Sequence, residues 1–244
     1  MVFIVGYYIM QRIYKREKLG EEQLDKLLMY MLIFTIVGAR LGHCLFYEPG
    51  YYFSNPIKFL YVWEGGLASH GGAIGILIGL YIYAKKIEKP YIWILDRIVV
   101  PVAIGGAFIR TGNLMNSEIY GQPTDLPWGF KFVRDYPIGT PIENIPACHP
   151  TQIYEALFCV AVFIYLLYAY YKQNMAERRP GFMFGIFLIV VFGSRIMIEF
   201  IKNHQVAFED NMVLDMGQWL SIPFLLAGIY FVVRSFFKSE KLKN

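Results

Sequence analysis

The sequence predicts an all-α polytopic membrane protein, and three observations support this fold class. Hydrophobic residues make up 56% of the 244 residues and charged residues only 17%, which is far from the balance of a soluble domain. Apolar segments of the length of membrane helices recur along the whole chain. Lys and Arg gather in alternate connecting segments, a pattern typical of the cytoplasmic loops of a membrane protein.

We expect a bundle of seven transmembrane helices in a single integral membrane domain, residues 1–244. Residues 1–10 are apolar but shorter than the roughly 20 residues that cross a bilayer. The first helix is therefore expected to be truncated, with its first half missing from this chain. No basic residue precedes this segment and no small-residue cleavage site follows it, which disfavours a signal peptide. The other six helices are expected at about 27–47, 66–84, 91–109, 152–171, 182–201 and 213–237.

The distribution of basic residues gives the expected orientation of the bundle. Sixteen of the 23 Lys and Arg residues lie in 11–26, 85–97, 172–179 and 234–244. The opposite loops hold only four of them, Lys58, Lys131, Arg134 and Lys202. The positive-inside rule then predicts a cytoplasmic C-terminus and an N-terminus outside. The polar insertion at 117–150 is expected to form a small extracytoplasmic head.

Three arginines remain, and all lie within or at the ends of apolar segments: Arg40, Arg110 and Arg195. An arginine at the centre of a membrane helix costs roughly 2.5 to 3.5 kcal/mol on insertion scales, so it seldom occurs there without a partner. All three are expected near the outer ends of their helices, where few acidic partners occur. This arrangement favours an anionic ligand such as a phosphate. A purely structural role for all three is the alternative.

A polar cluster follows the apolar segment that ends near residue 109. Arg110, Asn113 and Asn116 recur at three-residue steps, which places them on roughly one helix face, and Glu118 follows two residues later. These side chains either converge on one polar ligand or form a structural ion pair at the end of the helix.

Two histidines and a carboxylate are further candidates. His70 opens the third segment beside glycines that let a helix or a lipid headgroup approach closely, although a structural histidine is the alternative. His149 opens the fifth segment. Arg195 and Glu199 are spaced i, i+4 and can pair with each other.

Several classes of partner and cofactor are disfavoured. No basic block with interleaved aromatics occurs, so a nucleic acid is not an expected partner. Cys44, Cys148 and Cys159 have no paired spacing, and the four histidines include no i, i+4 pair. We therefore expect no disulfide framework, no metal and no cofactor.

Six motifs occur in a fixed order between about residues 38 and 223. They are Gly-Ala-Arg-Leu-Gly, His-Gly-Gly-x-Ile-Gly, Arg-x-Gly-Asn-x-x-Asn-x-Glu-x-x-Gly, His-Pro-x-Gln-x-Tyr-Glu, Arg-x-x-x-Glu-Phe and Gly-Gln-x-Leu-Ser-x-Pro. The third motif is specific, whereas the others would be weak alone. Together they resemble the prolipoprotein diacylglyceryl transferase family in order and spacing.

The resemblance implies a transferase of the bacterial cell (inner) membrane. It would move the diacylglyceryl group of phosphatidylglycerol to the lipobox cysteine thiol of a preprolipoprotein, forming a thioether and releasing glycerol phosphate, as the first step of lipoprotein maturation. The implied partners are phosphatidylglycerol, preprolipoprotein signal peptides with a lipobox cysteine, and membrane lipids.

The resemblance implies roles for Arg110, Asn113, Asn116, Glu118, His70 and Arg195, and the other polar residues of the motifs are added as candidates. Those expected to be catalytic are His70, Arg110, Glu118 and Arg195. Those expected to bind substrate are Arg110, Asn113, Asn116, Arg40, Glu199 and His149. The substrate brings the nucleophile, a thiol whose free pKa is about 8.5. A base is therefore needed to convert this thiol to the thiolate. His70 is the first candidate and Glu118 the second.

The chain departs from the family pattern at three points. The family has a tyrosine near the outer end of its first helix, and this chain begins after that point. Val191 stands where tyrosine is frequent, and Ile109 replaces the glycine that usually precedes Arg110. The first departure would affect activity and the other two only the packing near the site.

A transporter or scramblase of an anionic lipid is the rival interpretation. It predicts arginines spread across the depth of the bilayer and symmetric halves, whereas the three arginines cluster near one face and no internal repeat occurs. A ligand-binding receptor would not need the amide and acidic side chains beside Arg110.

Overall fold

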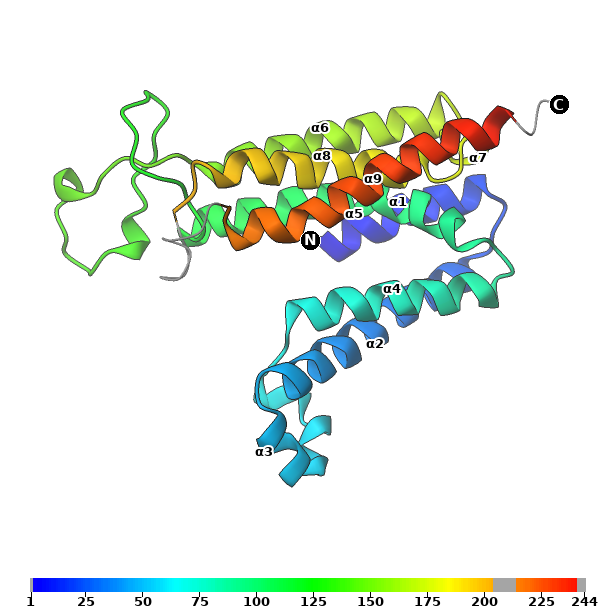
Figure 1. Cartoon of the computed structure of the whole chain (residues 1–244), viewed down its shortest axis with the longest axis horizontal. Coiled ribbons are helices and arrows are strands. Elements are labelled where there is room, and N and C mark those ends of the chain that lie inside the picture. The colour runs from blue at the N-terminus through cyan, green and yellow to red at the C-terminus, as the bar shows by residue number, and fades with distance from the viewer. Residues whose placement is uncertain (1, 204–213, 241–244) are drawn as a thin grey trace. The chain divides into compact units, whose positions relative to one another are not determined.

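The computed structural model describes residues 2–203 and 214–240, and this part of the chain is mostly helical. The long helices are α1 (Val2–Arg16), α2 (Glu21–Phe46), α4 (Ser69–Lys86), α5 (Tyr91–Asn116), α6 (Thr151–Tyr171), α8 (Phe182–Glu199) and α9 (Met216–Glu240) (Figure 1). The short elements are α3 (Pro49–Ser54), α7 (Met175–Arg178) and the 3-10 turns η1 (Pro56–Leu60), η2 (Val62–Glu64), η3 (Val133–Asp135) and η4 (Ile142–Asn144).

Five of the described helices, α2, α5, α6, α8 and α9, are long and apolar enough to cross a membrane. A helix satisfies all of its internal backbone hydrogen bonds, which is why helices can span hydrocarbon. This confirms the prediction of an all-α multi-pass membrane protein. The other two predicted positions are occupied by α1, with 15 residues, and α4, with 18 residues. The count of seven spans therefore stays a prediction.

Contacts within the chain divide it into two compact units, which we describe separately. One unit comprises Tyr7–Leu95, and the other comprises the chain from Asp96 onward together with the residues before Tyr7. The boundaries fall inside α1 and α5. The single membrane domain expected over residues 1–244 stays a prediction.

In the first unit, glycines bring the backbones of α2 and α4 into direct contact. A Cβ atom on Gly75 would lie 2.0 Å from the carbonyl oxygen of Phe34, and one on Gly71 would lie 2.2 Å from that of Gly38. Any larger residue at these two positions would push the helices apart. The close approach follows the small-residue pattern of membrane helix pairs.

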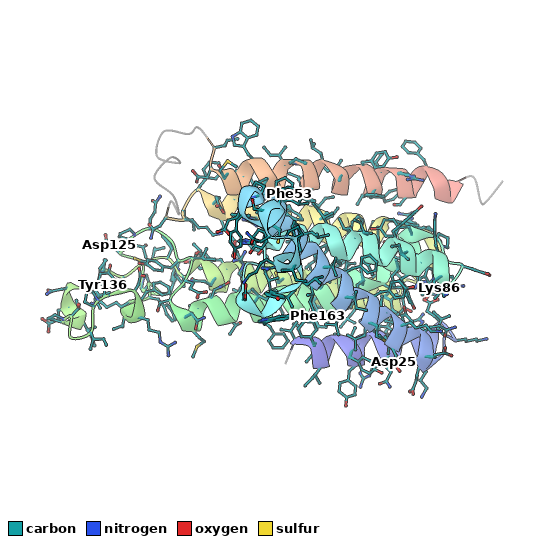
Figure 2. All side chains as sticks on the ribbon, turned by 90° about the horizontal axis from the view of Figure 1, so that it is seen from below. Asp25, Phe53, Lys86, Asp125, Tyr136 and Phe163 are labelled. Carbon is teal, nitrogen blue, oxygen red and sulfur yellow. The ribbon has the colours of Figure 1, made fainter. Side chains whose placement is uncertain are left out.

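Tyrosine hydroxyls join three helices at the other end of this unit. The hydroxyls of Tyr14 on α1 and Tyr83 on α4 lie 2.7 Å apart, and Tyr83 donates to the Gln23 carbonyl of α2 at 2.9 Å. Figure 2 shows Asp25 and Lys86 at this end of the helix pair and Phe53 at the opposite end, in the connection that contains α3.

In the second unit, a buried aspartate on α5 caps the start of α8. The Asp96 side chain is fully buried and accepts hydrogen bonds from the backbone N–H groups of Gly181 at 2.6 Å and Phe184 at 2.9 Å. Helix α8 has no side-chain cap of its own. The first N–H groups of a helix lack internal partners, and here a carboxylate from another helix accepts hydrogen bonds from two of them. Its position also suits the positive end of the helix dipole.

Residues 117–150, which we call the head, connect α5 to α6, and their extracytoplasmic location stays a prediction. Their backbone forms the short turns η3 and η4 and isolated β-bridges, among them those that pair Pro123 and Phe130 with Cys148. The rings of Tyr120 and Phe132 stack at a centroid distance of 4.3 Å and form a small aromatic core. Figure 2 shows Asp125 and Tyr136 in this insertion, beyond the ends of the helices that it joins.

Candidate active site

Arg110 lies near the C-terminal end of α5 and faces α6. Its Nε atom lies 2.6 Å from Glu155 Oε2, with side-chain exposures of 22% for the arginine and 7% for the glutamate. This is an ion pair without a well-aligned hydrogen bond, because Glu155 Oε2 receives none. Arg110 also donates from Nη1 to Asn113 Oδ1 at 3.5 Å. A structural ion pair was one of the two roles that the sequence allowed for Arg110, and Glu155 is the carboxylate that forms this pair.

Glu118 gathers the two asparagines of the polar cluster. Asn113 donates to Glu118 Oε2 at 2.8 Å, and Asn116 donates to Oε1 at 3.3 Å. The chain turns back after α5 through Ser117 and Ile119, whose φ angles of 59° and 58° lie in the left-handed region. This turn brings the Glu118 carboxylate over the end of its own helix. The structure therefore joins the four polar residues of the motif through side-chain contacts.

The first turn of α6 holds this reversal in place. Gln152 Nε2 donates to the Glu118 carbonyl at 2.7 Å, and Thr151 Oγ1 donates to the Ile119 carbonyl at 3.0 Å. Both side chains are almost fully buried, with 1% and 0% exposure. The His-Pro-x-Gln-x-Tyr-Glu motif and the Arg-x-Gly-Asn-x-x-Asn-x-Glu motif are thus two parts of one local structure.

Lys202 is the functional candidate that the sequence analysis missed. Its Nζ atom lies 2.7 Å from Glu155 Oε1 and 3.1 Å from Glu199 Oε2, and its side chain is only 4% exposed. The i, i+3 spacing from Glu199 was the available signal. Glu199 therefore pairs with Lys202 instead of Arg195. A chain of alternating charges runs from Arg110 through Glu155 and Lys202 to Glu199.

Arg195 and His149 lie in the same unit as this chain of charges. The Arg195 side chain is partly buried, and its Nε atom is buried with no hydrogen-bond partner among residues 2–203 and 214–240. A buried N–H group without a partner costs free energy unless a ligand or water satisfies it. His149 is also partly buried, and its Nδ1 lies 3.4 Å from the Tyr154 hydroxyl.

Arg40 belongs to the Tyr7–Leu95 unit and anchors the loop before α4. Its guanidinium donates to the carbonyl oxygens of Lys58 at 2.5 Å, Phe59 at 3.1 Å and Gly65 at 2.6 Å. The side chain is buried, and carbonyl oxygens of the loop disperse its charge. This loop-holding role is the structural alternative from the sequence, and substrate binding by Arg40 stays a prediction.

His70 also belongs to the Tyr7–Leu95 unit. It lies in the first turn of α4 and is exposed within that unit. Its neighbour Gly71 makes the tight contact with α2 described above. Its role as a base stays a prediction.

Cys148 in the head is a poor nucleophile. Its side chain is buried, and burial raises the pKa of the Cys148 thiol above its ordinary value. Only the thiolate is nucleophilic, so the protonated thiol is unreactive near neutral pH. This agrees with a chemistry in which any reacting sulfur comes from a substrate.

A pocket of about 170 Å³ opens between α5 and α6 beside Arg110. Most of its wall is apolar, and its polar side chains include Arg110 and Gln152. Residues that line it on the two helices include Ala107, Arg110, Thr111, Gln152, Ala156 and Val160. A cationic group in the wall of a mostly apolar pocket suits an amphiphile with an anionic head.

Comparison with known proteins places the chain in a family. The family model described as prolipoprotein diacylglyceryl transferase matches residues 1–234. A protein of Porphyromonas gingivalis named phosphatidylglycerol–prolipoprotein diacylglyceryl transferase is 48% identical over 240 residues, covering 96% of this chain and 85% of the relative. Proteins of the same name from Tolumonas auensis and Chloroherpeton thalassium are 47% and 42% identical, covering 96% of this chain and 87% and 84% of their own lengths. The chain belongs to the prolipoprotein diacylglyceryl transferase family.

Proposed function

We propose that this protein transfers the diacylglyceryl group of phosphatidylglycerol to the lipobox cysteine of preprolipoproteins. The names of its relatives specify the lipid and the protein substrate. The observation that carries the proposal is the pocket beside Arg110, where a guanidinium meets an apolar groove between α5 and α6. An anionic lipid has the matching chemistry, with a phosphate for the arginine and acyl chains for the groove.

The reaction is a substitution at carbon. The cysteine sulfur attacks the glyceryl carbon that carries the phosphate, a C–S bond forms and the C–O bond to the phosphate breaks. The electron pair of that bond leaves on glycerol phosphate, and the thiol proton passes to a base. The products are a thioether-linked diacylglyceryl cysteine and glycerol phosphate.

Arg110 and Arg195 are proposed to bind the phosphate and to stabilise the charge that develops on it. In Arg110, the Nε atom faces Glu155 and Nη1 reaches Asn113 only at 3.5 Å, so the outer N–H groups are well suited to a phosphate. The buried Nε of Arg195 is a second donor that an anion would satisfy. Donors aimed at developing charge typically contribute 10² to 10³ in rate, or about 3 to 4 kcal/mol each.

His70 is proposed as the base that accepts the thiol proton, and Glu118 is the alternative candidate for that role. The Glu118 carboxylate is oriented by the amides of Asn113 and Asn116. Glu199 and His149 are proposed as further substrate-binding residues, and so, in the Tyr7–Leu95 unit, is Arg40. Glu199 acts there through Lys202, with which it pairs.

The same proposal includes a location and an orientation. We propose a cell (inner) membrane protein with a cytoplasmic C-terminus and an extracytoplasmic head at 117–150. The distribution of Lys and Arg supports this orientation. It brings the polar end of α5 to the outer side, where a secreted lipobox becomes available.

The test is a transfer assay in detergent with phosphatidylglycerol and a lipobox peptide. The measured products are the thioether-linked peptide and released glycerol phosphate. Arg110→Ala should abolish both products, whereas Arg134→Ala, which removes an exposed arginine of the head, should leave them unchanged. Transport or scrambling of an anionic lipid is the alternative, and it would appear as lipid binding without either product.

A further inference from the structure

Gln152 carries a buried acceptor that nothing in the described part of the chain satisfies. Its side chain is 1% exposed, and its Oε1 atom has no hydrogen-bond partner among the described residues. A buried acceptor without a partner is rare, and it destabilises the state in which it stays unsatisfied. The acceptor therefore needs an explanation, either structural or functional.

The orientation of this amide is fixed by its other end. Gln152 Nε2 donates to the Glu118 carbonyl at 2.7 Å, and only the NH₂ end of the amide can donate to a carbonyl oxygen. The oxygen must then be the end that remains without a partner. It can accept a hydrogen bond only from an O–H or N–H group that is brought to it.

Gln152 and Arg110 line the same pocket. On a comparable measure a single water needs roughly 10 to 15 Å³, and the pocket of about 170 Å³ is much larger. Its polar side chains thus combine a cation and an acceptor with the hydroxyl of Thr111, which donates to the Ala107 carbonyl at 2.9 Å. Neighbouring atoms cover Oε1 itself, so a side chain at the pocket wall must shift when a donor reaches it.

We infer that Gln152 selects the headgroup of the lipid substrate by accepting a hydrogen bond from a hydroxyl of that headgroup. This inference rests on the proposed function and names the ligand chemistry of the same pocket: a hydroxylated phosphodiester, with the phosphate on Arg110 and a glycerol hydroxyl on Gln152 Oε1. A phosphodiester of equal charge without a hydroxyl leaves the acceptor unsatisfied and is disfavoured. Gln152 thereby determines specificity without taking part in the bond changes.

The test compares phosphatidylglycerol with phosphatidylpropanol, which has the same single charge and no headgroup hydroxyl. Binding to the purified protein is measured by native mass spectrometry, and turnover by the thioether product. The unmodified protein should prefer phosphatidylglycerol by roughly tenfold to a hundredfold, the usual effect of leaving one buried acceptor unpaired. In Gln152→Met this preference should fall to about onefold, since neither lipid then gains the hydrogen bond.

Thr151→Val is the matched control. It removes the neighbouring hydrogen bond to the Ile119 carbonyl, which holds the same chain reversal, but it leaves the Gln152 amide in place. The preference for phosphatidylglycerol should therefore survive in Thr151→Val. If Gln152→Met does not fold, Gln152→Lys serves instead, because an ammonium still donates to the Glu118 carbonyl and offers no acceptor.

Equal binding of the two lipids to the unmodified protein, or an unchanged preference in the Gln152 variants, would overturn the inference and leave a trapped water as the partner of Oε1. The two proposals fail in different ways. Selective binding without a thioether product contradicts the transferase function and supports the role of Gln152. Turnover without selectivity contradicts the role of Gln152 and supports the transferase function.

Discussion

Glu155 lies between two cations, with Oε2 2.6 Å from Arg110 Nε and Oε1 2.7 Å from Lys202 Nζ. The three residues come from α5, from α6 and from the segment after α8. Each oxygen of one buried carboxylate therefore holds a different part of the unit that contains α6 and α8. For function this means that Glu155 orients Arg110, while Lys202 in turn orients Glu155.

Neutralising Glu155 should destabilise the protein strongly. Glu155→Gln leaves Lys202, which is 4% exposed, with Glu199 as its remaining carboxylate. Removing one partner of a buried ion pair costs about 3 to 5 kcal/mol. Thermal unfolding in detergent should show a large fall in Tm. The comparison is Glu64→Gln, which breaks the exposed pair with Lys58 and should cost less than about 1 kcal/mol. Equal shifts in Tm for the two variants would contradict this prediction.

Replacing Arg110 by lysine should not preserve activity. Lysine keeps the charge but lacks the planar fork that contacts Glu155 and Asn113 and still presents N–H groups to a phosphate. We expect kcat of the transfer reaction to fall by about 10² to 10³ with little change in Tm. Lys131→Arg in the head is the control substitution and should leave kcat unchanged. A kcat within a few-fold of the unmodified protein would show that charge alone suffices.

Asp96 should stabilise α8 from outside that helix. In Asp96→Asn only one side-chain oxygen remains to accept from the N–H groups of Gly181 and Phe184, and the negative charge at the start of the helix is lost. We expect a loss of about 1 to 2 kcal/mol, the usual value of a helix cap. Thermal unfolding measures it, with the exposed Asp125→Asn as the control. Identical Tm values for the two variants would argue against a capping role.

The head should lose stability at alkaline pH because of Tyr120. Burial is the larger cause and the hydrogen bond to the Asp135 carboxylate the smaller one, and both raise the pKa of Tyr120 above its ordinary value of 10.0. The folded state thus keeps the proton more tightly than the unfolded state. The stabilisation is complete below pH 10 and is lost as pH rises through the raised pKa in the folded head.

Tyr120→Phe tests this pH dependence. Without the hydroxyl, unfolding no longer releases that proton, so the fall in stability above pH 10 should become shallower. Proteolysis of the head as a function of pH is the measurement, because it reports local unfolding. The same slope in both proteins would assign the alkaline loss to another group.

The helices were predictable because their signal lies in consecutive residues. The boundaries were less so: the second helix was expected from 27 and begins at Glu21, and the fourth was expected to end at 109 and extends to Asn116. Apolar composition marks the part of a helix in hydrocarbon, whereas the helix itself continues into polar residues. Glu21 and Glu22 suit the first turn of a helix, so charge there does not end it.

The site was only partly predictable. The residues of the polar cluster near Arg110 are close in sequence, so their convergence on Glu118 followed from local spacing. Lys202 was assigned to an outer loop and was not recognised as a site residue. Its partner Glu155 lies 47 positions away, and no local pattern reveals that contact. Similarly, the i, i+4 spacing of Arg195 and Glu199 suggested a pair, but Glu199 instead contacts Lys202. Contacts across a long sequence separation depend on packing, which a single sequence does not encode in any short pattern.

The glycine contact between α2 and α4 also restricts where a lipid can travel. Because a Cβ added at Gly75 would lie only 2.0 Å from the Phe34 carbonyl oxygen of the facing helix, no hydrocarbon chain fits between the helices there. Those two helices therefore form a closed wall. The pocket between α5 and α6, by contrast, leaves about 170 Å³ open beside Arg110. Acyl chains therefore cannot pass between α2 and α4 at these glycines, whereas the pocket between α5 and α6 has space for them.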